Sequence, residues 1–117
     1  AFASSISHDS HNIIAVGCTD QDLMLAINEL IKEKGGLTVN EEGKLHSLPL
    51  PIGGIISDKS GREVADRYMK LNEMLLKMGT PLKSPFMTLS FMALIVIPTL
   101  KIGEKGIFDF EKFDFVK

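Results

Sequence analysis

Residues 19–39 read TDQDLMLAINELIKEKGGLTV, and this stretch predicts a helix that leads directly into a strand. Thr19 stands where a helix N-cap belongs, and Asp22 follows three residues later as a variant of the capping box. An apolar stripe at helical spacing predicts the buried face: Leu23, Ala26, Ile27, Leu30 and Ile31. We expect Gly35 and Gly36 to end the helix, because glycine adopts the left-handed C-cap conformation at low cost.

The segments on either side of this helix predict strands. The apolar run at residues 13–16, closed by Gly17, indicates a short buried strand. Residues 37–39 and 44–50 flank a polar turn and predict a β-hairpin. Pro49 and Pro51 lack backbone donors, so the second strand should fray there into a loop that carries Gly53 and Gly54.

Two further helices are predicted downstream. Ser60 and Glu63 form a capping box, and Gly79 ends the helix. Its predicted buried face consists of Val64, Tyr68, Leu71, Leu75 and Met78. Pro85 begins a short third helix that is apolar nearly all round, so it should be buried or covered by a partner. With two strands expected in the tail, residues 1–117 predict a single compact α/β (α+β) domain. In it a small mixed sheet is flanked by two main helices and a short buried third helix.

Composition excludes several classes of protein. Of the 117 residues 44% are apolar and the formal net charge is −2, which gives no electrostatic reason to expect nucleic acid or a membrane as partner. The longest apolar stretch, near residues 91–97, is far short of a bilayer span. Cys18 is the only cysteine, which fits a reducing cytoplasm, and we expect it to be a small core residue. The opening residues Ala1-Phe2-Ala3 resemble the middle of a polypeptide, so we expect a fragment or a processed product.

Residues 7–12 combine groups that can carry chemistry. Imidazole can bind a metal or transfer protons, and a neighbouring carboxylate fixes its tautomer. The candidates are His8, Asp9, His11 and Asn12. A polar turn that satisfies its own backbone groups is the alternative. We expect no complete metal site, because the only other histidine is His46, on the hairpin.

Weaker candidates have structural explanations. Asp20 and Asp22 stand at a helix start, where capping explains them better than paired catalysis. Gly53 and Gly54 lack the pattern of a phosphate loop and indicate a turn. The apolar segment at residues 85–91 is expected to supply part of the domain's own core and part of a docking surface. The docking candidates are Phe86, Met87, Leu89 and Phe91.

Three segments resemble one family in the same order along the chain. They are SHDSHNI at residues 7–13, LPLPIGG at residues 48–54 with Ser57 and Asp58, and PFMTLSF at residues 85–91. Together they resemble the C-terminal region of bacterial and archaeal adenine deaminases of the amidohydrolase superfamily. The likeness runs from about Ser4 to Phe115, with departures at Ile95 and at residues 103–105.

The resemblance implies the hydrolysis of adenine to hypoxanthine and ammonia. It implies a binuclear manganese or iron centre in a barrel that this chain lacks, so we expect no catalytic residue, no metal site and no activity in this chain alone. His8, Asp9, His11 and Asn12 would contact the substrate or support groups that do. The implied partners are the barrel of the same polypeptide, adenine and further copies in a homo-oligomer.

Two other functions stay open from the sequence. The chain could be a stand-alone interaction module without catalysis, whose apolar face and polar loop bind a protein. It could also be a small metal-binding protein that uses His8, Asp9 and His11.

Overall fold

A four-stranded antiparallel sheet lies at the centre of the fold. The computed structural model describes residues 1–116. The elements in chain order are β1 (Phe2–Ser4), β2 (Ile14–Val16), α1 (Asp20–Lys32), β3 (Gly36–Glu41), β4 (Lys44–Pro49), α2 (Gly61–Lys77), α3 (Pro85–Met92), β5 (Leu100–Gly103), β6 (Gly106–Asp109) and β7 (Asp114–Phe115). The strand order is β2-β1-β3-β4 in the central sheet and β5-β6-β7 in a second sheet. The α/β class and the three helices are confirmed. The predicted mixed sheet is wrong in one respect: all the strand pairs within residues 1–116 are antiparallel.

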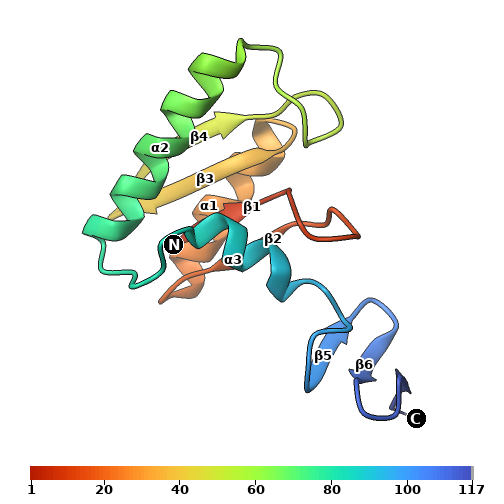
Figure 1. Cartoon of the computed structure of the whole chain (residues 1–117). Coiled ribbons are helices and arrows are strands. Elements are labelled where there is room, and N and C mark those ends of the chain that lie inside the picture. The colour runs from red at the N-terminus through yellow and green to blue at the C-terminus, as the bar shows by residue number, and fades with distance from the viewer. Residues whose placement is uncertain (117) are drawn as a thin grey trace.

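The central sheet is covered on both faces by helices (Figure 1). Leu37 and Val39 point from β3 toward α2 and α3 and share a buried cluster with Leu71 and Phe86. The intervening side chains face α1, where small residues such as Ala3 and Ala26 surround Leu30. Side chains alternate between the two faces of a strand, so β3 is buried almost throughout.

The predicted starts of the helices are confirmed. The backbone N–H of Asp22 donates to the Thr19 hydroxyl at 3.1 Å, and Ser60 forms a reciprocal capping box with Glu63. The hairpin is confirmed, but its turn is shorter than predicted, because Asn40 and Glu41 pair within β3 and only two residues lie between β3 and β4. Glu42 and Gly43 both have positive φ, which is the type I′ geometry that suits the twist of a hairpin.

The end of α1 differs from the prediction by one position. Lys34, rather than a glycine, takes the first left-handed position with φ 62°. The backbone N–H of Lys34 donates to the carbonyl of Ile31, and that of Gly35 donates to the carbonyl of Leu30. This pair of bonds is a Schellman motif, in which the next residue, Gly35, continues with φ 111°.

Several predicted buried positions are exposed. Ile31 lies beyond the edge of the buried stripe of α1 and is 61% exposed, and Met78 at the end of α2 is exposed as well. The strand β2 is half-buried instead of buried, because it is an edge strand. Cys18 follows that edge strand and is exposed, so its expected place in the core is wrong. The strand β1 was not predicted from the sequence.

The last three strands form a small sheet that lies apart from the central one. We call residues 100–116 the C-terminal arm, and Figure 1 shows it beyond the end of α3. Phe108 is buried in the arm, with the rings of Phe113 and Phe115 packed edge-on against it at 5.4 and 5.3 Å. None of the helices within residues 1–116 is long and apolar enough to cross a membrane.

Candidate functional site

The loop between β1 and β2 carries all four predicted site residues. Asp9 and His11 have positive φ values of 79° and 49°, which Asp and His tolerate better than most residues. The buried Ser7 donates its hydroxyl to the backbone carbonyl of Asn12, and the N–H of His11 donates to the carbonyl of Ser7. These bonds close residues 7–12 into a tight turn in which the side chains of residues 8–12 are exposed.

This turn is fastened to α3. The backbone N–H of His8 donates to the carbonyl of Ser90 at 2.9 Å. The imidazole of His8 stacks on the ring of Phe91, with 4.8 Å between ring centroids and 26° between ring planes. The structure therefore brings together two of the segments that carry the family resemblance, although they lie far apart in the sequence.

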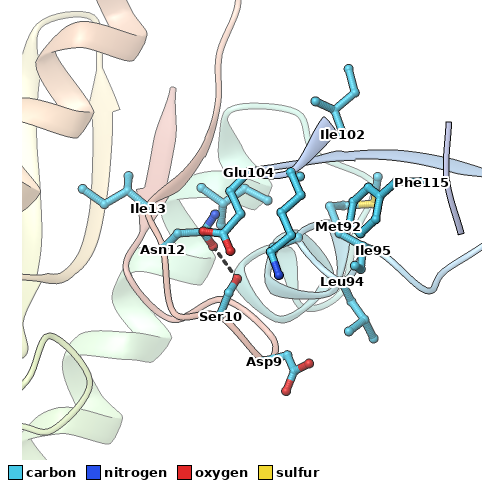
Figure 2. Close-up of a pocket in the computed structure, with 14 residues that line it drawn as sticks. Asp9, Ser10, Asn12, Ile13, Met92, Leu94, Ile95, Ile102, Glu104 and Phe115 are labelled. Atoms are coloured by element: carbon cyan, nitrogen blue, oxygen red, sulfur yellow. Dashed lines mark hydrogen bonds between the residues drawn. The ribbon is translucent and has the colours of Figure 1, made fainter. Parts of the chain in front are cut away.

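An open cleft of about 500 Å³ lies between the turn and the C-terminal arm. Asp9, Ser10 and Asn12 line it from the turn, and the Ser10 hydroxyl donates to the Asn12 side-chain oxygen at 3.0 Å (Figure 2). The arm contributes Glu104 and Lys105, and apolar side chains complete the lining. His8 and His11 do not line this cleft, so the four predicted residues do not form one cluster.

A second loop, residues 50–58, starts at the same end of the sheet as the turn at residues 7–12. The strands β1 and β4 are both antiparallel to β3, so their C-terminal ends lie together. The buried Ser5 hydroxyl accepts from the Gly36 N–H at 2.7 Å and donates to the carbonyl of Gly54. A Cβ on Gly35 would overlap the Cα of Gly54, so the two backbones touch.

This second loop was not predicted as part of the site. Its exposed apolar side chains are Ile52, Ile55 and Ile56. The two bonds between Ile52 and Ile56 hold the loop as a small hairpin, so the isoleucines are presented on an ordered backbone. The sequence feature that could have identified this loop as part of the site is its three isoleucines, because loop residues are usually polar.

The predicted docking residues on α3 divide into two groups. Phe86 and Leu89 are buried, and the ring of Phe86 packs edge-on against Phe2 at 5.3 Å. These two residues belong to the domain's own core and are not available as surface. Met87 and Phe91 are 55% and 40% exposed, so they alone keep the docking interpretation.

Several carboxylates outside the turn at residues 7–12 have structural roles. The Ser60 hydroxyl donates to Glu63 and lowers the pKa of that carboxyl, and the backbone N–H of Lys112 lowers the pKa of Asp109. The Asp22 carboxylate accepts from Thr19 and Asn40, which supports the capping interpretation. Within residues 1–116 no three His, Cys, Asp or Glu side chains group closely enough to hold a metal ion.

Comparison with known proteins identifies the family. The profile of the adenine deaminase C-terminal domain family matches residues 1–114. The chain is 57% identical over 117 residues to a protein of Methanosarcina barkeri named adenine deaminase, covering all of this chain and 21% of that relative. Proteins of the same name from Methanosarcina mazei and Bacillus subtilis are 59% and 48% identical, and each alignment covers 99% of this chain and 21% or 20% of the relative. The chain thus spans about a fifth of the length of these relatives.

Proposed function

The chain belongs to the adenine deaminase C-terminal domain family, and on that premise we propose that it is the C-terminal domain of an enzyme that hydrolyses adenine to hypoxanthine and ammonia. The observation that carries this proposal is the match over residues 1–114 together with the high identity to proteins named adenine deaminase. A stand-alone interaction module is not favoured, because these relatives are named as enzymes.

The reaction needs an activated water, which a binuclear manganese or iron centre would supply in the family. The residues of this chain do not fit such a centre, because residues 1–116 bring no three suitable ligands together. We therefore assign the metal to the part of the enzyme beyond this domain. The third function considered from the sequence, a small metal-binding protein, is not proposed.

We propose that the turn at residues 7–12 lies at the mouth of the purine pocket. Support comes from the turn's construction: its polar side chains are exposed, and its backbone is held by Ser7 and Ser90. Asn12 offers a carboxamide, which can pair with N6 and N7 of adenine. Asp9 and the two imidazoles add groups that accept hydrogen bonds or move protons.

We further propose that the exposed apolar residues dock on the remainder of the enzyme. The docking surface consists of Met87, which is exposed on α3, and the loop at residues 50–58, which we call the isoleucine loop and which starts at the same end of the sheet as the turn. The relatives are about five times as long as this chain, which supports a docking surface supplied by the rest of one polypeptide.

The test uses a full-length polypeptide that carries this domain. We expect His8→Ala and Asn12→Ala each to lower kcat/KM for adenine, because each removes a polar group from the pocket mouth. His46→Ala serves as the matched control, because His46 is exposed on β4 and should leave kcat/KM unchanged. A wild-type polypeptide that does not turn over adenine would overturn the enzyme assignment. Unchanged kcat/KM in both turn variants would overturn only the role of the turn.

A further inference from the structure

We propose that Phe91 is a positioning residue that fixes the orientation of the His8 imidazole. This inference rests on the proposed function, in which the turn at residues 7–12 faces the substrate. His8 is exposed, and its contacts within residues 1–116 include the stack on Phe91 and the backbone bond to Ser90. Stacking uses the face of the imidazole, so both ring nitrogens, which lie on its edge, stay accessible to a ligand.

The orientation of His8 is determined at two points. The hydrogen bond from its N–H to the Ser90 carbonyl fixes the backbone, and the stack fixes the ring. A histidine side chain has only two rotatable torsions, so once the backbone is fixed the stack on Phe91 leaves the ring little freedom. An exposed histidine without them would sample several rotamers.

The surface on which His8 stacks is itself held firmly. Phe86, at the start of α3, is buried in the core and anchors the helix. The Ser90 hydroxyl donates to the carbonyl of Met87 at 2.7 Å, within the last turn of the helix. Phe91 is therefore a fixed platform at the rim of the turn. A functional side chain that such packing holds in its productive orientation supports a higher reaction rate than a mobile one.

The physical reason for the arrangement is preorganisation. If the imidazole acts on the substrate only when correctly oriented, removing the stack on Phe91 lowers the fraction of enzyme–substrate complexes that can react. A displacement of about 1 Å at a catalytic group can cost about 100-fold in rate. Phe91 would thus influence turnover without contacting the substrate.

The stack can be tested without any activity by NMR of this chain. The Phe91 ring should shift the His8 ring protons upfield, and Phe91→Leu should abolish that shift while Phe91→Tyr keeps it. Phe110→Leu is the matched control, because Phe110 is 39% exposed and Phe91 is 40% exposed. A dispersed amide spectrum for Phe91→Leu establishes that the variant folds. His8 protons without an upfield shift in the wild type would overturn the proposal.

The functional test is a double-mutant cycle in a full-length adenine-deaminating polypeptide. Phe91→Leu should lower kcat by about 10- to 100-fold with little change in KM, and Phe91→Tyr and Phe110→Leu should behave like wild type. In a His8→Ala background Phe91→Leu should have no further effect, because Phe91 acts through His8.

Two results would separate the proposals. If Phe91→Leu lowers kcat as much in the His8→Ala background as in wild type, the positioning role is overturned. That result would indicate docking instead, while the proposed function stands. A wild-type polypeptide that shows the NMR shift but no adenine turnover would overturn the proposed function and the effect of Phe91 on turnover, while the stack of His8 on Phe91 stands.

Discussion

Replacing Gly35 by alanine should destabilise the chain more than the same change at Gly79. The two glycines are matched, because each follows the C-terminal end of a helix and their φ values are 111° and 104°. Alanine in this backbone region costs about 1–3 kcal/mol at either site. At Gly79 an added Cβ would meet no atom within 4 Å.

At Gly35 a second cost is added. The new Cβ would overlap the Cα of Gly54 and lie 3.0 Å from the Ser5 hydroxyl oxygen. Forcing an extra carbon into such a packed place costs about 1–3 kcal/mol more. The expected loss in unfolding free energy is therefore about 2–6 kcal/mol for Gly35→Ala and about 1–3 kcal/mol for Gly79→Ala.

Urea unfolding of the two variants measures the difference. At a slope of about 2 kcal/mol per molar urea, typical of a small protein, the extra loss of about 1–3 kcal/mol places the midpoint of Gly35→Ala about 0.5–1.5 M below that of Gly79→Ala. Equal midpoints would refute the reasoning, because they would mean that the loop at residues 50–58 does not pack on the end of α1. A lower midpoint for Gly79→Ala would refute it even more directly.

Leu30→Ala should reduce the unfolding free energy by about 2–5 kcal/mol, because Leu30 is fully buried, whereas the exposed Ile31→Ala should change it by less than about 0.5 kcal/mol. Equal losses in urea unfolding would contradict the assigned buried face of α1. Ser60→Ala should raise the lowered pKa of Glu63 in an NMR titration, since the Ser60 hydroxyl is the main cause of the lowering. That carboxylate stabilises the fold above its unfolded pKa and loses this effect as the pH falls through its folded pKa, so the stability difference between wild type and variant should shrink in acid to the part contributed by the N-cap bond from the Glu63 N–H to the Ser60 hydroxyl. Thr38→Val should cost about 1 kcal/mol in thermal unfolding, because the buried Thr38 hydroxyl donates to a carbonyl of α1; an unchanged Tm would argue against that bond.

The features predicted correctly from the sequence are local ones. The N-cap at Thr19, the capping box at Ser60 and the turn before Lys44 each depend on residues within a few positions of one another. Their geometry is therefore set before any distant segment packs. Helical periodicity predicts which faces of α1 and α2 are apolar, but it does not predict how wide the buried stripe is, and Ile31 lies outside that stripe.

The features that were missed depend on distant contacts. The strand β1 has only three residues, and it exists because β2 and β3 pair with it on both sides. Its sequence, Phe2-Ala3-Ser4, carries no strand pattern of its own. Cys18 is exposed because β2 is an edge strand, and strand order cannot be derived from periodicity.

The composition of the candidate site was only partly predictable. Residue types alone identified the turn at residues 7–12, because so many groups that can carry chemistry stand close together there. The sequence could not show that Asp9 and Asn12 line a cleft while His8 stacks on Phe91. It also could not show that Ser5 links the turn's strand to the isoleucine loop, since that bond joins residues from distant parts of the chain.

The C-terminal arm has a consequence for how the family can vary. Its aromatic cluster around Phe108 is formed by residues of the arm itself, and its tip lines one wall of the cleft. Substitutions or length changes at that tip therefore leave the packing between the central sheet and its helices intact. Both departures from the family resemblance, Ile95 and residues 103–105, lie in the arm or in the segment leading to it. One wall of the cleft can thus change without disturbing the core, while the turn on the opposite wall stays tied to α3.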